Sequence, residues 1–254
     1  MVPLDLELDT KSLNSTGMAQ RGDWGKNFWS KQIVDHMKIK SSKTIQLRSV
    51  HGAVQSVNKE LLCYFSPYYA AALNGRFAEA RQDIFRVDLS GKQLQVFINW
   101  IYTGKLEFQS WEREDRVKLY IFADLVDILA LRRLIMTEKG RMERYREVGL
   151  VMSHLPSSSL YRRRTVDHYA NHWKPEDDIY DPISSLEITI HRMFFCEVVQ
   201  SEARAKANRH SGCSCCTNVC NFHEHEDEEE WHATCGQLPN SKKPEKQYFA
   251  KCGR

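Results

Sequence analysis

The chain has 254 residues, and its 36 lysines and arginines against 33 aspartates and glutamates give a formal net charge of +3. So small a net charge does not indicate a nucleic-acid binder, and no stretch approaches the roughly 18 uninterrupted apolar residues of a membrane-spanning helix. Hydrophobic residues make up 42% of the chain, enough for a buried core, and charged residues make up 27%. The length allows one or two domains.

Residues 1–23 are polar and rich in Ser, Asn, Thr and Gly, which predicts a disordered N-terminus. The opening sequence MVPLDLELDTK is acidic and lacks the basic start and apolar core of a secretory signal. We therefore expect an intracellular protein of the nucleus or cytoplasm. Its eight cysteines are then expected to be reduced or bound to metal rather than paired as disulfides.

Residues 24–40 are predicted to contain an amphipathic helix. Its apolar side chains, Trp29, Ile33 and Met37, recur at i, i+4 and i+8 and so lie on one face. A single amphipathic helix must bury that face, and an interface between two subunits is one place for it. The alternatives are a helix packed on its own domain and a linker.

Residues 41–106 predict a compact unit of the α/β (α+β) class. Two short strands, 44–47 and 53–57, are joined by a turn at His51-Gly52. Two short helices follow, separated before Pro67 because proline disfavours a helical conformation in the preceding residue. A strand within 83–89 comes next. The clearest helical stripe of the sequence consists of Leu94, Phe97, Ile98 and Ile101, with Gly104 as the expected stop.

Residues 107–137 are expected to add a short strand at Glu107-Phe108 and a closing pair of helices. Apolar residues occupy most positions around the first helix, which predicts that it is buried, and the second carries three more. These residues are Val117, Leu119, Ile121, Phe122, Ala123, Leu125, Val126, Ile128, Leu129, Leu131, Leu134 and Ile135.

Residues 138–208 predict a weaker helical extension, punctuated by three prolines. Helical spacing recurs around Met142–Val148, Leu160–Trp173 and Leu186–Val199. The basic run Arg162-Arg163-Arg164 is interpreted as a solvated helix face or a partner contact. Cys63 and Cys196 are interpreted as small buried hydrophobic residues.

Residues 43–135 resemble a BTB/POZ domain, and the likeness depends on the order and spacing of several short matches. These matches are Asn58-Lys59 with Leu61-Leu62, Ser66-Pro67-Tyr68-Tyr69, Ala71-Ala72-Leu73, Phe77-Ala78-Glu79-Ala80 and Trp100-Ile101-Tyr102-Thr103-Gly104. The resemblance implies a small sheet flanked by helices over 41–137, a non-enzymatic interaction scaffold and a homodimer with Trp29, Ile33 and Met37 at the interface. The extension resembles that of compact BTB proteins of filamentous fungi.

The resemblance also implies two kinds of partner. In one branch of the family the domain is a substrate adaptor that binds a cullin within a cullin-RING ubiquitin ligase. The alternative is a nuclear regulator of transcription or chromatin with a zinc-stabilised tail. Asn58 stands where the family often has His, and Thr44-Ile45 stands where Asp commonly opens the first strand. The charged groove that this Asp lines in some transcriptional members is therefore not expected here.

Residues 209–254 form a Cys/His-rich acidic tail, in which eight cysteines and histidines lie from 213 to 235. Zinc prefers four thiolate or imidazole ligands, and pairs with two to four intervening residues present them well. On that spacing we predict a structural zinc site with ligands from Cys213, Cys216, Cys220, His223 and Cys235; Cys215 and His225 lie in the same stretch. The alternative is a solvated acidic tail with reduced thiols, because six of residues 224–230 are acidic.

Signatures of catalysis are otherwise absent from the sequence. It contains no Walker-type loop, no dinucleotide-binding glycine pattern and no G-x-S-x-G nucleophile pattern. Ser56-Val57-Asn58-Lys59 fits S-x-x-K formally, but four residues with two fixed positions occur by chance in most chains. We therefore expect no enzyme activity and no catalytic residue.

Overall fold

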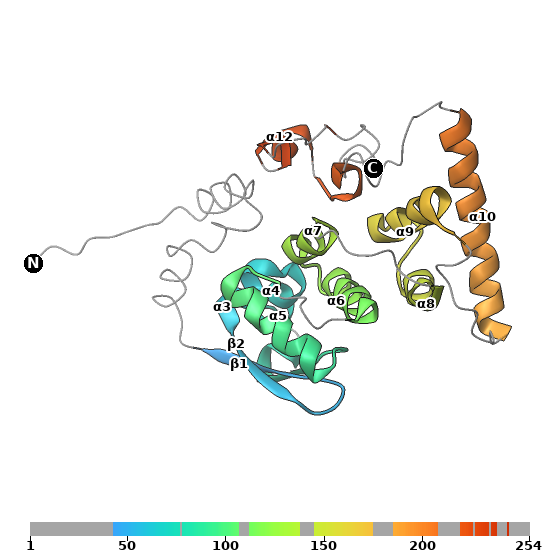
Figure 1. The fold of residues 1–254 in the computed structure, drawn as a ribbon. Coiled ribbons are helices and arrows are strands. Elements are labelled where there is room, and N and C mark those ends of the chain that lie inside the picture. The colour runs from blue at the N-terminus through green and yellow to red at the C-terminus, as the bar shows by residue number, and fades with distance from the viewer. Residues whose placement is uncertain are drawn as a thin grey trace, which may run out of the picture.

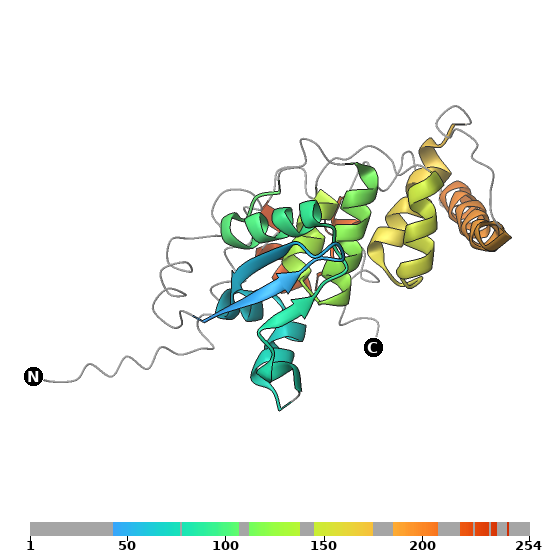
Figure 2. The ribbon, with the colours of Figure 1, turned by 90° about the horizontal axis from the view of Figure 1, so that it is seen from below.

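The computed structural model describes residues 43–76, 78–106, 112–137, 145–174, 185–207, 219–225, 227–233, 235–237 and 243. The fold is mixed α/β, with a small sheet of three strands among the described residues. Figure 1 places the strands and the first helices at one end, helices α8 to α10 at the other and the C-terminal elements above α7. The same separation is visible from below in Figure 2. The α+β class predicted from the sequence is confirmed at this level.

The sheet has the order β2-β1-β3. Strands β1 (Thr44–Arg48) and β2 (Val54–Asn58) pair antiparallel, and β3 (Ile84–Arg86) runs parallel to β1. Gly52 adopts the left-handed conformation with φ +87 in the turn between β1 and β2, which a residue with a Cβ rarely adopts. The predicted hairpin and the third strand are confirmed.

Helices α3 (Lys59–Phe65) and α4 (Pro67–Asn74) are separated at Ser66, as the position of Pro67 predicts. The Ser66 hydroxyl accepts the backbone N–H of Tyr69 at 3.1 Å and so caps α4. The same hydroxyl donates to the Val126 carbonyl at 2.5 Å. This buried serine therefore connects the break between α3 and α4 to Val126, a residue far along the chain. A 3-10 turn, η2 (Ala78–Arg81), precedes β3.

Helix α5 (Gly91–Thr103) begins with a reciprocal capping box between Ser90 and Gln93. It ends at Gly104, which is left-handed with φ 72. All members of the predicted stripe are buried, and Trp100 joins them with 1% exposure. These side chains belong to the main hydrophobic core, which also takes in β1, β2, α3, α4, α6 and α7.

Helices α6 (Arg113–Leu125) and α7 (Leu129–Thr137) form the predicted closing pair. The prediction that α6 is buried around its circumference is wrong at Leu125, which is 71% exposed. The physical reason is that α6 ends there: Val126 and Ile128 enter the core, and Asp127 turns the chain with φ 52. The apolar pattern of the sequence continues across this turn and so does not indicate where α6 ends.

Helices α8 (Tyr145–His154), α9 (Leu160–His172) and α10 (Ser185–Ala207) pack around a second cluster made by Val148, Val166, Tyr169 and Phe194. The interpretation of the basic run as a solvated face is wrong for Arg162, which is 6% exposed and pairs with Glu197 of α10. Cys196 is exposed rather than buried, because Phe194 takes the inward position on α10. Cys63 is partly buried against the main core.

The C-terminal elements are short: η4 (Val219–Phe222), α12 (Glu228–Ala233) and η5 (Cys235–Gln237). η4 contacts α7 and α9, and Phe222 is buried in the main core. We call the described residues 219–225, 227–233 and 235–237 the C-terminal segment.

Some predictions lie outside the described residues. They are the N-terminus 1–23, the helix within 24–40 with Trp29, Ile33 and Met37, the strand at Glu107-Phe108, and the ligands Cys213 and Cys216. Among the described residues, no helix combines the length and apolar character needed to cross a bilayer.

Candidate metal centre

Four buried side chains of the C-terminal segment meet at one point. They are Cys220, His223, His225 and Cys235, and their ligand atoms all lie within 4.8 Å of one another. Cys220 comes from η4, Cys235 opens η5, and the histidines lie in the stretch between η4 and α12. The local fold therefore gathers two thiols and two imidazoles that are up to fifteen residues apart in sequence, and this group could hold a metal.

The donor atoms lie within a small movement of the spacing that a tetrahedral zinc needs. Bonds of about 2.3 Å to sulfur and about 2.0 Å to nitrogen place ligand atoms about 3.3–3.8 Å apart. His223 Nδ1 lies 3.2 Å from Cys235 Sγ, and the remaining separations do not exceed 4.8 Å. A small inward movement of the side chains would complete the tetrahedron. Two sulfurs with two nitrogens is also a donor set that suits zinc.

The two ring nitrogens of His223 have different roles. Nδ1 faces Cys235, while Nε2 lies 3.1 Å from the Thr137 hydroxyl of α7. A ligand histidine usually hydrogen-bonds through the nitrogen that the metal does not use, which fixes the tautomer and the ring orientation. Burial lowers the pKa of His223, so the imidazole is held in the neutral form that a metal requires.

The cluster is sealed on another side by Trp231 of α12, which is 6% exposed and packs with Cys220 and Cys235. Gly236 follows the second cysteine, and a Cβ there would lie 3.1 Å from the Trp231 carbonyl and 3.3 Å from its ring. A glycine at 236 thus allows η5 to approach α12 closely enough to place Cys235 in the group.

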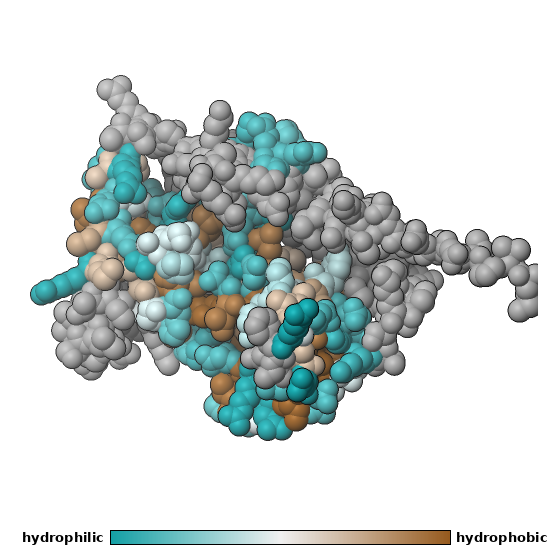
Figure 3. Space-filling model, turned by 180° about the vertical axis from the view of Figure 1, so that it is seen from behind, coloured by the Kyte–Doolittle hydropathy of each residue, from teal (hydrophilic) through white to brown (hydrophobic). Residues whose placement is uncertain are grey.

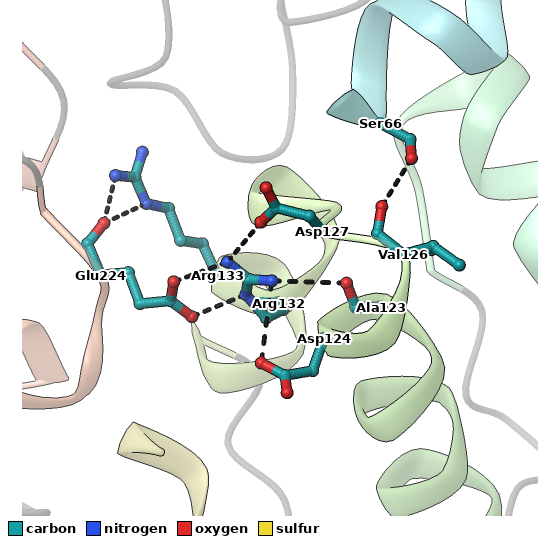
Figure 4. A network of polar contacts seen from close by, with 8 residues as sticks. All are labelled: Ser66, Ala123, Asp124, Val126, Asp127, Arg132, Arg133 and Glu224. Carbon is teal, nitrogen blue, oxygen red and sulfur yellow. Dashed lines mark hydrogen bonds and ion pairs between the residues drawn. The ribbon is translucent and has the colours of Figure 1, made fainter. Parts of the chain in front are cut away.

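Glu224, between the two histidines, attaches this group to the rest of the fold (Figure 4). Its carboxylate binds Arg132 of α7 through two contacts of 2.7 Å, from Nε and Nη2. Its backbone carbonyl accepts a hydrogen bond of 2.7 Å from Nε of Arg133, and a second from Nη2. Neighbouring arginines thus hold the side chain and the main chain of one glutamate.

Arg132 is 7% exposed and sits among further acceptors. It lies 3.1 Å from Asp127, 3.7 Å from Asp124 and 3.4 Å from the Ala123 carbonyl. Burial lowers the pKa of Arg132, but the effects of Glu224, Tyr120 and Asp124 together outweigh burial and the net pKa is raised. Burial also raises the pKa of Asp124, against the opposing effect of Arg132. Glu224 is therefore paired with a buried arginine of the domain, while its side chain stays 32% exposed.

The geometry favours a structural role for this group over catalysis. Four protein ligands fill a tetrahedral site, whereas catalytic zinc sites keep one position open for water or substrate. The alternative use of a close thiol and imidazole is a cysteine nucleophile activated by histidine. Cys235 and His225 are 0% exposed, and Cys220 and His223 are 3% and 2% exposed, so a substrate does not reach these sulfurs in this conformation.

Three predicted ligands, Cys220, His223 and Cys235, are brought together, and the fourth member is His225. The spacing criterion passed over His225 because only one residue separates it from His223. In extended backbone, however, side chains at i and i+2 project to the same side. His225 takes part in a β-bridge while His223 lies in a bend, so the i, i+2 spacing of the two histidines is the only local signal that could have found it.

No model of a known protein family matches the chain, and no curated protein is significantly similar to it.

Proposed function

We propose that this chain is a non-enzymatic protein-interaction module: a self-associating scaffold of the BTB/POZ type with a structural zinc in its C-terminal segment. The observation that carries the proposal is the order of elements in 43–137, β-β-α-α-β-α-α-α. The short matches on which the resemblance depends occupy the strand-to-helix junction at Asn58, the helix break at Ser66 and the end of α5.

The sheet offers a surface for such interactions. Along β1 the inward side chains Ile45 and Leu47 are buried, while the alternate positions of β1, β2 and β3 are exposed or partly exposed. Four large apolar side chains are among the exposed residues of this part of the fold: Val50, Val54, Tyr68 and Ile84. Figure 3 shows brown apolar residues at the lower edge of the molecule, where the sheet lies. Exposed apolar side chains next to sheet edges are typical of contact surfaces.

Self-association is tested by the molar mass of the full chain, measured by light scattering over a range of concentrations. We expect a dimer in the wild type and a monomer after Ile33→Asp, because a charge on the predicted interface stripe opposes burial. Val199→Asp is the matched control, since Val199 is 62% exposed on α10. A wild-type chain that stays monomeric at every concentration would contradict the proposal.

The zinc of the proposal is structural, since its ligands fill the coordination shell and the segment has only a small core of its own. Metal analysis of purified protein should give one zinc per chain, and Cys235→Ser should abolish it. Cys196→Ser is the matched control because Cys196 is exposed and lies outside the group. A wild-type chain without zinc after refolding in excess metal would contradict this part of the proposal alone.

Two kinds of partner follow from the resemblance, and one pair of experiments separates them. A cullin adaptor should retain a purified cullin in a pull-down. A chromatin regulator should be retained on DNA, with binding that weakens steeply as salt rises. Asp227, Glu228 and Glu229 lie beside the candidate metal centre, and their charge opposes phosphate binding there. This arrangement favours a protein partner over DNA.

A further inference from the structure

We infer that α7 is a docking site for the C-terminal segment, and that the metal of the candidate centre controls whether this site is occupied. The inference rests on the structural zinc of the proposed function and adds a partner and a regulation to it. The partner of α7 is this chain's own segment, 91 and 92 residues away in sequence from Arg133 and Arg132. Arg132, Arg133 and Thr137 form what we call the α7 docking site.

Glu224 has a potential metal ligand on each side of it in the sequence. Its neighbours His223 and His225 both belong to the candidate metal centre. A metal bound by both histidines fixes the backbone on each side of Glu224, whose carboxylate is not part of the group and lies on the side of α7. That side is occupied by Arg132 and Arg133. Ligation therefore presents Glu224 to α7 in one fixed orientation.

The α7 docking site holds the metal ligands in position. The Thr137 hydroxyl lies 3.1 Å from His223 Nε2, which leaves Nδ1 for the metal. Arg133 holds the carbonyl of Glu224, so the backbone between the two histidine ligands is fixed from α7. Thr137 and Arg133 are therefore positioning residues. Neither is a ligand, but Thr137 orients the His223 ring and Arg133 fixes the backbone between the two histidines.

Both arginines of the α7 docking site are buried and need partners for their charge. Arg132 is 7% exposed and Arg133 is 1% exposed. Glu224 provides Arg132 with a bidentate carboxylate and Arg133 with a carbonyl. Buried guanidinium groups depend on such partners, because desolvation of an unpaired charge is expensive. Release of the segment removes these contacts from both side chains, so docking is favoured by α7 as well as by the metal.

Linkage makes the two events reciprocal. If metal binding favours docking, then docking raises the affinity for metal by the same factor. The candidate centre and the α7 docking site therefore act as one unit, in which loss of zinc uncovers the arginine pair and loss of the arginine contacts weakens zinc binding.

The experiment measures both sides of this unit in the full chain. Zinc affinity is determined by competition with a chromophoric chelator in the wild type, Glu224→Gln and Thr137→Val. Glu229→Gln is the matched control, because Glu229 is an exposed acidic residue of the same segment. We expect zinc binding to weaken about 10- to 100-fold in the first two variants, as for other residues that support metal ligands, and to stay unchanged in the control. Co2+ spectra should show the same S2N2 ligand set in every variant.

Hydrogen exchange supplies the reciprocal measurement. Removal of zinc from the wild type should speed exchange of the 219–225 amides and leave α5 protected. If the wild type binds no zinc, the zinc of the proposed function is wrong and the inference falls with it. If zinc binds but Glu224→Gln binds it equally well, or exchange ignores the metal, only the coupling is overturned. Far-UV circular dichroism of each variant shows that the domain remains folded.

Discussion

Residues 43–137 and the C-terminal segment bury their side chains in different ways. The first region has a continuous apolar core from β1 to α7, to which Val151 of α8, Leu155 just after it and Tyr161 of α9 also belong. The second has a cluster of only Cys220, Trp231 and Cys235, plus one residue, Phe222, placed in the main core. It depends instead on a few polar contacts with α7 and on four potential metal ligands. A large core tolerates the loss of one contact, whereas a segment with few contacts does not.

The largest expected effect comes from metal loss, which should loosen the C-terminal segment and spare the main core. Cys235→Ser removes one of the two thiol ligands and should abolish stoichiometric zinc, since structural zinc supplies much of the folding free energy of segments with little core. Trp231 fluorescence and hydrogen exchange should report a loosened C-terminal segment, while urea denaturation of the main core changes little. Equal loss of protection in both regions would contradict the comparison.

Truncation of a core side chain should destabilise the main core and spare the C-terminal segment. Phe97 is 0% exposed, lies 6.0 Å from Trp100 and 5.1 Å from Phe122 between ring centroids, and belongs to the predicted stripe of α5. Phe97→Ala should lower the free energy of unfolding by about 3–5 kcal/mol through lost burial and a cavity. Urea denaturation of the zinc-loaded chain measures it. Leu125→Ala is the control, and its 71% exposure predicts a change within about 0.5 kcal/mol.

A single buried hydroxyl should have an intermediate effect. Ser66→Ala removes the cap of α4 and the donor to the Val126 carbonyl together. We expect a loss of about 1–3 kcal/mol in the free energy of unfolding, from a lost cap and an unpaired buried carbonyl. Ser66→Thr keeps the hydroxyl and should recover part of the loss. Identical stabilities of the Ala and Thr variants would show that the hydroxyl contributes nothing.

Acid should weaken the C-terminal segment before the core. Burial lowers the pKa of His223, so the unfolded segment binds a proton more readily than the docked one. Its contribution is therefore present above the ordinary histidine pKa of about 6.5 and is lost as pH falls below it, by at most about 1.4 kcal/mol per pH unit. Hydrogen exchange of the metal-free chain between pH 7.5 and 5.5, values chosen to span about one unit on each side, measures this. His223→Gln should flatten the profile.

The smallest expected effect comes from a cysteine outside the candidate centre. Cys196→Ser should leave zinc content unchanged and alter the free energy of unfolding by less than about 0.5 kcal/mol, because its side chain is exposed on α10. Metal analysis and urea denaturation check both. A loss of zinc here would show that the ligand set differs from Cys220, His223, His225 and Cys235.

Local features of the sequence predicted much of the first region. The stripe of α5, the stop at Gly104, the turn at Gly52 and the break before Pro67 each depend on residues within a few positions of one another. Periodicity, capping and positive φ are local properties, so they can be read from the order of residues. The end of α6 was missed because Leu125 continues an apolar pattern that the turn at Asp127 interrupts.

The sequence by itself therefore determined the α+β class, the strands and helices from β1 to α5 to within a few residues, and three of the four members of the candidate centre. Only the tertiary structure decided that His225 completes the group, that Arg162 is buried against Glu197 and that Glu224 is held by Arg132 and Arg133. The reason is physical. A guanidinium 92 residues from its carboxylate leaves no periodic trace in the chain, and whether an acidic residue is solvated or neutralised depends on which surface the fold places beside it.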